Sequence, residues 1–336
     1  MQKKCLITGG AGFIGSHLTE ALLAQNHLVT VVDDQSTGNA KNLSLVANHP
    51  NLTYIEGTIS DTALIRTLVK ETDEVYHLAA AVGVALIAKE PLQTIERNIG
   101  PTQFLLDTLC EEHTAGRDVK IFLASTSEVY GKNPKECWNE EDDLVFGPTT
   151  RARWSYGASK AIDEFLALAC WRQQKLPVVI ARFFNVVGPR QSGAYGMVLP
   201  RFVQAAMAGK APVIHDDGKQ TRCFAHVDDV VKAIINLMNT PEAVGEVINL
   251  GSDQPVSILE LANSVIRKIN PELNLEFCSY SQAYDKDFED IRHRVPNLEK
   301  ISRLIDYRPT HDLDSIVDSV IEYHKENTPS RGSSLP

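Results

Sequence analysis

With 336 residues, 43% of them hydrophobic and 23% charged, the chain is long enough to bury a large core and has an ordinary globular composition. Its formal net charge of −10 argues against a nucleic-acid partner, because phosphate backbones attract proteins with a basic excess. The six cysteines and ten histidines are dispersed, so we expect neither disulfides nor a metal site. No apolar run reaches membrane-spanning length and a predicted strand follows the first residues at once, so we expect a cytoplasmic protein without signal peptide or membrane partner.

The chain begins with the pattern of a strand, a glycine-rich loop and a helix. An apolar run at 5–8 and helical spacing at 16–25 flank the loop Gly9-Gly10-Ala11-Gly12-Phe13-Ile14-Gly15. Glycines let the backbone turn tightly and approach a pyrophosphate, whose charge is met by free N–H groups at the helix start. Turn formation alone is the alternative role for such glycines.

The next predicted strand, at 28–32, ends in Asp33. An acidic residue about 20 positions beyond such a loop can accept hydrogen bonds from the adenosine ribose, and its charge would repel a 2′-phosphate. The pattern therefore predicts NAD rather than NADP. A solvated residue at a strand end is the alternative role for Asp33.

Strands and helices continue to alternate, which implies a parallel sheet covered on both faces. Gly100-Pro101 should kink or break the longest helix, because a proline removes a backbone hydrogen bond. The fold class we expect is α/β, a Rossmann-type doubly wound parallel sheet with a smaller mixed α/β substrate lobe. Further strands are expected at 52–56, 74–78, 120–125 and 178–183, and helices at 63–70, 92–113 and 156–173.

A polar cluster follows the strand at 120–125. Thr126 can hydrogen-bond a substrate hydroxyl, and Glu128 can take or give a proton. Ligands of parallel sheets bind beyond the carboxyl ends of the strands, so this cluster should face the same crevice as the glycine loop. Serine and threonine also form turns after strands, which is the structural alternative.

Tyr156 and Lys160 are four residues apart in the segment Arg153-Trp154-Ser155-Tyr156-Gly157-Ala158-Ser159-Lys160 and would share one face of a helix. A free tyrosine has a pKa near 10, so it becomes a useful base only where a positive charge stabilises its phenolate. Lys160 can supply that charge. Taken alone, the spacing also fits an amphipathic helix with an exposed lysine.

The pattern loosens after residue 183. We expect helices at 199–208, 258–269 and 314–326, a strand at 247–250, a turn at 216–224 and Asp229 as a helix cap. The predicted domains are a dinucleotide-binding domain at 1–183 with a segment near 222–240, a substrate lobe at 184–221 and 241–325, and a disordered tail at 328–336.

The loop from Thr8 to Gly15, together with Thr126, Tyr156 and Lys160, resembles the extended short-chain dehydrogenase/reductase family. This family contains NAD-dependent nucleotide-sugar epimerases, dehydratases and decarboxylases, and the likeness extends to about residue 325. It implies that Tyr156 takes the proton of the sugar 4-hydroxyl while hydride passes from C4 to NAD. It also implies that Lys160 lowers the pKa of the phenol and binds the nicotinamide ribose, and that Thr126 aligns the hydroxyl.

The same resemblance implies further contacts. Thr58 stands where the family usually has an adenine-binding aspartate, which puts that contact in doubt. Family members commonly dimerise through helices that correspond to 92–113 and to the Tyr156 helix. The implied cofactor residues are Gly9, Gly12, Phe13, Ile14, Gly15, Asp33, Ile59, Leu78, Ala79, Ala80, Tyr156 and Lys160, and the implied substrate residues are Ser127, Asn185, Arg190, Arg222 and Arg294.

The residues after Thr126 separate the subfamilies. Sugar 4,6-dehydratases carry Asp-Glu there, whereas this chain has Ser127-Glu128. The segment Thr-Ser-Glu-Val-Tyr-Gly, the stretch from Arg153 to Tyr156 and Arg292-His293-Arg294-Val295-Pro296 resemble UDP-glucuronate decarboxylases. By that resemblance Arg294 lies near the sugar carboxylate or the reacting C4 to C6 region, and Glu128 assists decarboxylation or proton return.

We therefore expect an enzyme that oxidises C4 of a UDP-sugar transiently, with UDP-glucuronate decarboxylase as the leading hypothesis. The product would be UDP-xylose or a UDP-4-keto-pentose. A UDP-sugar 4-epimerase of the UDP-glucose or UDP-glucuronate type is the alternative. A non-catalytic NAD-binding protein is less favoured, because it has no use for Thr126, Tyr156 and Lys160 together.

Overall fold

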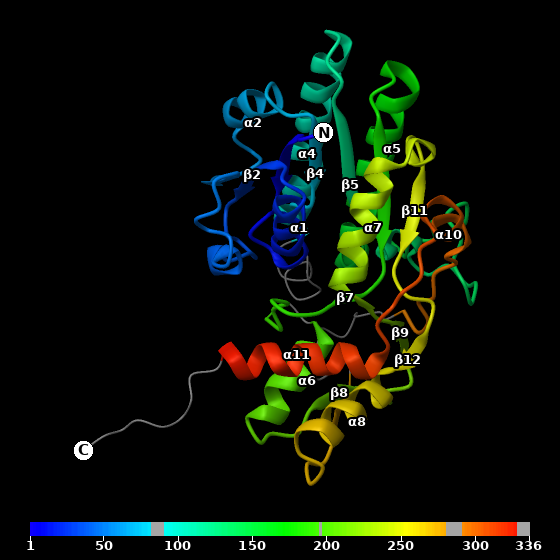
Figure 1. Ribbon diagram of the computed structural model, residues 1–336. Helices are drawn as coiled ribbons and strands as arrows, with labels where there is room; N and C mark the ends of the chain where they lie inside the picture. Colours follow the sequence, from blue (N-terminus) through cyan, green and yellow to red (C-terminus); the bar gives the residue numbers. More distant parts are fainter. Residues whose placement is uncertain (82–90, 195–196, 280–290, 328–336) are drawn as a thin grey trace.

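The computed structural model describes residues 1–81, 91–194, 197–279 and 291–327 and is built around a seven-stranded sheet (Figure 1). The strand order is β11-β6-β5-β4-β1-β2-β3, and every neighbouring pair is parallel. The predicted α/β class is confirmed. The strands are β1 Lys4–Thr8, β2 Leu28–Asp33, β3 Leu52–Glu56, β4 Glu74–His77, β5 Lys120–Thr126, β6 Val178–Phe183 and β11 Val247–Leu250.

Helices cover both faces of the sheet, and each face has its own apolar core. Successive strand side chains point to opposite faces, so Ile7 packs in one core and Leu6 in the other. The first core takes α1 (Phe13–Ala24) and α7 (Val227–Asn239), and the second takes α2 (Thr62–Val69), α4 (Pro91–Thr114) and α5 (Ser155–Gln174).

Helix α4 continues through Pro101, so of the predicted kink or break at Gly100-Pro101 the break is wrong. The helix has buried residues on both sides of the proline, among them Asn98 and Leu105, and it packs along α5. This packing outweighs the loss of one backbone hydrogen bond. Next to the proline, the Thr102 hydroxyl donates to the Asn98 carbonyl at 2.6 Å.

A smaller lobe lies beyond the carboxyl ends of the sheet strands (Figure 1). Its three helices contact one another and share a core that includes Leu199, Leu261 and Val317. Two short strand pairs complete the lobe. The elements are α6 Val198–Met207, α8 Ile258–Ile269 and α11 Leu313–Asn327, with β8 Val213–His215 paired to β13 Glu276–Cys278 and β9 Thr221–Cys223 paired to β12 Pro255–Ser257.

Strand β11 corrects one predicted boundary. It falls in 241–325, which we assigned to the substrate lobe, yet it pairs with β6 in the main sheet because its buried run completes that edge. The tail predicted at 328–336 lies outside the described residues. The remaining elements are β7 Val186–Val187, β10 Ala225–His226, α10 Glu299–Ile305, and the 3-10 turns η1 Ala40–Leu43, η2 Ser127–Tyr130, η3 Ala152–Trp154 and η4 Pro241–Ala243.

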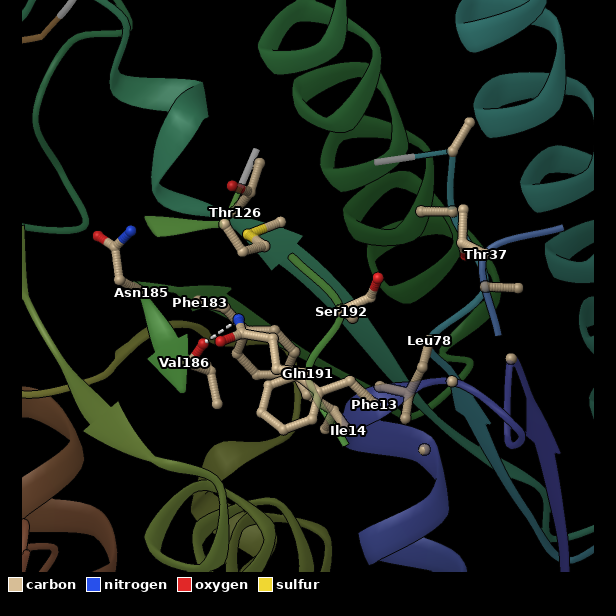
Figure 2. Close-up of a pocket in the computed structure, with 18 of the residues that line it drawn as sticks. Phe13, Ile14, Thr37, Leu78, Thr126, Phe183, Asn185, Val186, Gln191 and Ser192 are labelled. Carbon is tan, nitrogen blue, oxygen red and sulfur yellow. Dashed lines mark hydrogen bonds between the residues drawn. The ribbon is translucent and has the colours of Figure 1, made fainter. Parts of the chain in front are cut away.

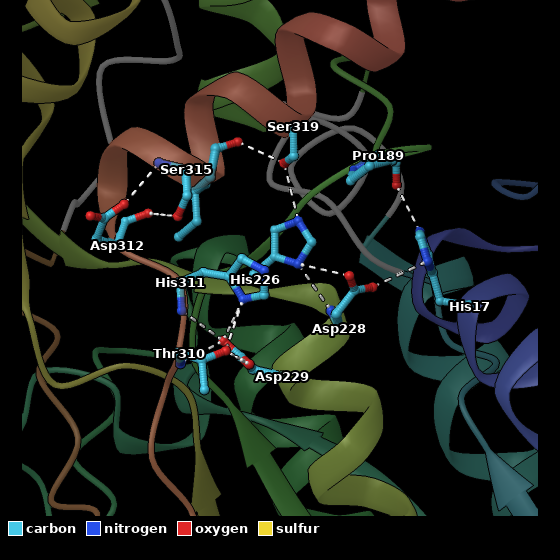
Figure 3. A network of polar contacts seen from close by, with 11 residues as sticks. His17, Pro189, His226, Asp228, Asp229, Thr310, His311, Asp312, Ser315 and Ser319 are labelled. Atoms are coloured by element: carbon cyan, nitrogen blue, oxygen red, sulfur yellow. Dashed lines mark hydrogen bonds and ion pairs between the residues drawn. The ribbon is translucent and has the colours of Figure 1, made fainter.

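The start of α7 joins the two parts of the molecule (Figure 3). Its N-cap is His226, whose Nδ1 accepts from the Asp228 N–H at 3.2 Å and whose Nε2 lies 3.1 Å from Ser319 Oγ on α11. The predicted cap Asp229 instead lies within the first turn of the helix, where its carboxylate binds Thr310 and His311. The prediction that Asp229 caps the helix is wrong, because its carboxylate is hydrogen-bonded to this other segment instead.

Candidate active site

A cavity of about 790 Å³ opens at the carboxyl ends of the strands, between the sheet and the small lobe. Figure 2 shows Thr126 and Asn185 toward one end, and Phe13, Ile14 and Leu78 toward the other. Of the predicted site residues, all except Ser127 and Lys160 line it. Those residues are Gly9, Gly12, Phe13, Ile14, Gly15, Asp33, Ile59, Leu78, Ala79, Ala80, Thr126, Glu128, Tyr156, Asn185, Arg190, Arg222 and Arg294.

The glycine loop is shaped by close contacts that larger residues would block. Gly9 has a φ of +75°, and a Cβ there would lie 2.8 Å from the Ala79 nitrogen. A Cβ at Gly15 would come within 2.2 Å of the Gly9 carbonyl oxygen. Gly12 is the N-cap of α1 and has no capping side chain, so the first turn of that helix faces the cavity directly. This cradle fits the pyrophosphate of a dinucleotide.

Asp33 is fixed at the end of β2 beside this loop. Its Oδ2 accepts from the Ala11 N–H at 2.9 Å and its Oδ1 accepts from the Gln35 N–H at 2.8 Å. Burial raises the pKa of Asp33, and the backbone hydrogen bonds oppose that rise. The carboxylate is therefore held in one orientation at the edge of the cavity, as recognition of ribose hydroxyls requires.

Tyr156 stands in the first turn of α5, where η3 leads the chain into the helix. Its phenol hydrogen-bonds Thr126 at the end of β5. Burial and the Glu128 carboxylate raise the pKa of Tyr156, and the Thr126 bond and Arg294 oppose them only in part. Within the chain's own residues Tyr156 is therefore a neutral phenol, and lowering its pKa requires a further positive charge.

Lys160 lies one helical turn after Tyr156 in α5. Its side chain is buried and does not line the cavity. Its Nζ is 2.8 Å from Asp163 Oδ2 on the same helix. His77 on β4 is close to it: burial and the Lys160 charge lower the pKa of His77 to about 3. Tyr156 and Lys160 thus lie one turn apart on α5, as their spacing predicts, and Lys160 is paired with a buried carboxylate that we did not predict.

Glu128 lies between two arginines. Arg294 Nη1 donates to Oε1 at 2.7 Å, and Arg153 Nη1 is 2.5 Å from Oε2. Burial alone would raise the pKa of Glu128, but the charges of Arg294 and Arg153 outweigh it and lower the pKa to about 2. Glu128 is accordingly a carboxylate at neutral pH, and this end of the cavity carries an excess of positive charge.

The loop at 132–151 holds Arg294 in place. The Trp138 N–H donates to the Val295 carbonyl at 2.8 Å, and the Asn297 N–H donates to the Trp138 carbonyl at 2.8 Å. Trp138 itself is fully buried. These bonds aim Arg294 at the cavity, where its Nη2 also donates to Ser127 Oγ at 2.5 Å. Ser127 therefore contributes by holding Arg294, although it does not line the cavity.

Comparison with known proteins agrees with this geometry. Residues 6–320 match the family model described as GDP-mannose 4,6 dehydratase. The chain belongs to the extended short-chain dehydrogenase/reductase family. It is 38% identical to the UDP-N-acetyl-alpha-D-glucosaminuronate decarboxylase of Bacillus cytotoxicus over 97% of this chain and 99% of that protein. It is 32% identical to UDP-glucuronic acid decarboxylase 1 of Xenopus tropicalis, over 97% of this chain and 73% of the relative.

Among solved structures, the chain is similar to UDP-glucuronic acid 4-epimerase from Bacillus cereus in complex with UDP-glucuronic acid and NAD. The TM-score is 0.85 at 28% identity, over 96% of this chain and 99% of the epimerase. This short-chain dehydrogenase/reductase is therefore an NAD-dependent nucleotide-sugar enzyme, and the predicted cofactor is confirmed.

Three of the predicted substrate residues differ in how they are held. Asn185 lines the cavity. Arg222 is buried and its Nη1 donates to the Thr221 carbonyl at 2.8 Å. Arg190 is turned toward α1, where its Nη2 is 2.7 Å from Glu20 Oε1 and its Nη1 is 3.2 Å from Ser16 Oγ. This arrangement supports Asn185 and Arg222 as substrate contacts and favours a position on the cofactor side for Arg190.

Arg153 is the functional residue that the sequence analysis did not assign. It precedes Tyr156 by three residues, in the resembling stretch, and η3 brings its side chain into the cavity beside Glu128. In the sequence, its position close to Tyr156 was the feature that indicated a role in the site. The sequence did not reveal which way a side chain in a short 3-10 turn would point.

Two histidines and an aspartate form a group that sequence spacing did not reveal. Within the described residues, ligating atoms of His226, Asp228 and His311 lie within 4.8 Å of one another. Both ring nitrogens of His226 already take part in hydrogen bonds, and its ring stacks on that of His311 at 4.1 Å (Figure 3). We assign this group to joining α7 and α11.

Proposed function

We propose that the protein is an NAD-dependent decarboxylase of a UDP-hexuronate. The single observation that carries this proposal is the position of Glu128 between Arg153 and Arg294, next to Tyr156 in the cavity. A substrate carboxylate at C6 is attracted by the surplus positive charge at this end. The names of the two decarboxylase relatives point the same way.

The proposed oxidation begins at Tyr156. With the sugar 4-hydroxyl hydrogen-bonded to Thr126, the Tyr156 phenolate takes the hydroxyl proton as the C4–H bond breaks. Bound NAD supplies the acceptor for the C4 hydride, can return it later, and brings the positive nicotinamide ring that helps to ionise the phenol. Gly9, Gly12 and Asp33 would hold this cofactor. Tyr156 is left as a neutral phenol that can donate a hydrogen bond to the new ketone.

Loss of carbon dioxide follows from the product of that oxidation. The C6 carboxylate is then β to the C4 ketone, so the C5–C6 bond can break with its electron pair moving to the ketone oxygen. The resulting enolate is stabilised by the Tyr156 hydroxyl, which keeps its proton, and a proton from solvent adds at C5. Return of hydride to C4 gives UDP-xylose from UDP-glucuronate, whereas release before that step gives the UDP-4-keto-pentose.

The substituent at sugar C2 separates the candidate substrates. The relative at 38% identity is named for an N-acetylated uronate and the relative at 32% for a glucuronate. We therefore propose that both UDP-glucuronate and UDP-N-acetylglucosaminuronate be tested. In this proposal the sheet domain holds the cofactor, and the small lobe holds the uridine diphosphate near Asn185 and Arg222.

Carbon dioxide release from either UDP-uronate tests the proposal, with the nucleotide product identified by mass spectrometry. The Tyr156→Phe variant is the matched control, because it keeps the ring and removes the proton acceptor. It should retain NAD and lose turnover by at least about 1,000-fold. A 4-epimer that keeps its carboxylate, formed as the sole product, would contradict decarboxylation.

A UDP-glucuronate 4-epimerase is the second candidate, favoured by the fold similarity to the Bacillus cereus enzyme. It would use the same oxidation at C4, followed by rotation of the keto sugar and return of hydride to its other face. The arginines around Glu128 would then hold a carboxylate that is retained. The product analysis above separates the two reactions.

We also propose that the protein is a cytoplasmic homodimer that pairs through α4 and α5. These helices pack together and expose Leu92, Ile95, Ile162 and Phe165, the last at 68%. Exposed large apolar side chains on two helices that pack together are typical of a protein interface. All six cysteines are free thiols, which fits a reducing compartment. Within the described ranges, no helix combines the length and apolarity needed to span a bilayer.

A further inference from the structure

Asp163 is a buried carboxylate that the proposed reaction does not use. Its side chain is fully buried, and its Oδ2 is 2.8 Å from Lys160 Nζ one helical turn earlier. Its Oδ1 makes no hydrogen bond within the described part of the chain. Burial raises the pKa of Asp163, and the Lys160 ammonium opposes that rise. Lys160 thus has a negative partner on its own helix.

The neighbouring Glu164 has a separate partner. Its carboxylate pairs with Arg182 at 2.8 Å and accepts from Ser125 Oγ at 2.5 Å. Helix α5 therefore buries two adjacent carboxylates, and each faces a different cation. Burying an ion pair costs desolvation that a well-packed apolar residue would avoid. Structural need alone does not account for a charge at Asp163.

We propose that Asp163 is a positioning residue that acts through Lys160 and sets the pH at which Tyr156 becomes a base. The carboxylate holds the ammonium against α5 and offsets part of its positive charge. Tyr156 must release a proton as readily as it takes one, so a phenolate that is too strongly stabilised would slow the protonation steps. This inference rests on the proposed proton transfer by Tyr156 and is independent of which UDP-sugar is bound.

The charges around Tyr156 come from several elements. Glu128 on η2 and Asp163 on α5 raise the pKa of Tyr156, after burial, which is the largest cause, and Arg294 lowers it. His77 on β4 faces Lys160 and stays neutral near pH 7, since its pKa is lowered to about 3 by burial and by Lys160. Glu164 faces Asp163, and its charge is paired with Arg182. Asp163 is therefore the buried carboxylate that contacts Lys160 and also raises the pKa of the Tyr156 phenol.

The test is the pKa of Tyr156 in the NAD-bound protein, read by NMR from labelled tyrosine ring carbons. Tyr156→Phe identifies the signal. Asp163→Asn keeps the shape and removes the charge, so the pKa of Tyr156 should fall by about one unit. A UDP-uronate is then added, and the rate of NAD reduction is read at each pH from the absorbance of reduced nicotinamide. The pH below which this rate falls should be lower in Asp163→Asn by the same amount. At pH values below the wild-type limit, the variant should therefore react about tenfold faster.

Glu164→Gln is the matched control, because it removes an equally buried carboxylate from the adjacent position. It should lower thermal stability and leave the pKa of Tyr156 in place. Asp163→Ser serves as a second variant where the asparagine variant does not fold. An unchanged or raised pKa of Tyr156 in these Asp163 variants overturns the proposal. The titration needs no turnover, so it remains decisive even where neither UDP-uronate proves to be the substrate.

Discussion

Arg294 and Glu128 are 166 residues apart in the chain, yet Arg294 Nη1 donates to Glu128 Oε1 at 2.7 Å inside the cavity. Arg153 approaches the other carboxylate oxygen. One negative and two positive charges are thus buried together beside Tyr156, and the balance favours an anionic sugar. The surplus charge is also why the pKa of Glu128 is lowered to about 2 and the side chain is ionised at neutral pH.

Glu128→Gln should lower kcat about 100-fold while lowering KM for UDP-glucuronate. The amide keeps the shape of the side chain but no longer neutralises the two arginines, so the substrate carboxylate binds more tightly and is harder to expel as carbon dioxide. Because the amide does not titrate, no choice of pH restores activity. Steady-state kinetics across the working pH range check this. A raised KM at unchanged kcat would mean that Glu128 acts only in binding.

Arg153→Met and Arg294→Met should each weaken binding of UDP-glucuronate at least about tenfold more than binding of UDP-glucose. A hydrogen bond to a charged group contributes about 1.5–3 kcal/mol, and only the uronate has the carboxylate to lose it. Calorimetric titration of both nucleotide sugars measures the difference.

Arg292→Met is the matched control for these arginine variants. Arg292 lies two residues before Arg294 with its side chain 56% exposed, and it pairs with Asp216 and Asp217 at the surface. Its loss should leave both affinities unchanged. If Arg153→Met weakens the binding of UDP-glucose and of UDP-glucuronate equally, Arg153 does not recognise the carboxylate.

The sheet and the glycine loop were predictable because their signals are local. Apolar runs of strand length alternate with helical spacing, and the glycines of 9–15 are needed by the backbone itself. The main sheet corresponded to the predicted strands, and the error lies in the lobe assigned to 241–325, since β11 and α10 both pack with the main sheet. Strand pairing depends on neighbours that are distant in sequence, and no local pattern at 247–250 reveals them.

The charge pairs of the site were less predictable, because burial decides their meaning. Lys160 and Asp163 are spaced like many exposed helical ion pairs, and only the fold puts them inside. Arg153 is next to a recognised motif, but the direction of its side chain depends on η3 and on Glu128. Asp229 has the composition of a helix cap, yet the Thr310–His311 segment takes its carboxylate and His226 caps α7.

Phe165→Glu should convert the proposed dimer to a monomer. In a two-fold dimer each copy contributes the same residue, so one substitution removes two apolar side chains from the interface. Burying a phenylalanine is worth about 1.5–3 kcal/mol, so the dissociation constant should rise at least about 100-fold. Light scattering with size exclusion measures the mass. Leu45→Glu, at a position 80% exposed outside α4 and α5, should leave it unchanged. A wild-type monomer at micromolar concentration would contradict the proposal.

His77 should make the protein less stable as the pH falls from about 6.5 toward 3. Its Nδ1 is 2.7 Å from Thr8 Oγ and its Nε2 is 2.9 Å from Thr102 Oγ, so the neutral ring is fully hydrogen-bonded in the core. Burial and the Lys160 charge lower its pKa to about 3, whereas the unfolded chain has a histidine pKa near 6.5. Below pH 6.5 the unfolded state therefore binds a proton that the folded state does not bind. This difference lowers the free energy of unfolding by about 2 kcal/mol at pH 5.

His77→Gln keeps a donor and an acceptor but does not titrate, so it isolates this contribution. Urea unfolding at pH 7 and pH 5 should show a loss of stability that is smaller in the variant than in the wild type by about 2 kcal/mol. A residual loss is expected in both proteins, because burial also lowers the pKa of His17 to about 4. The same pH dependence in variant and wild type would mean that His77 is protonated in the folded protein, and that Lys160 does not keep it neutral.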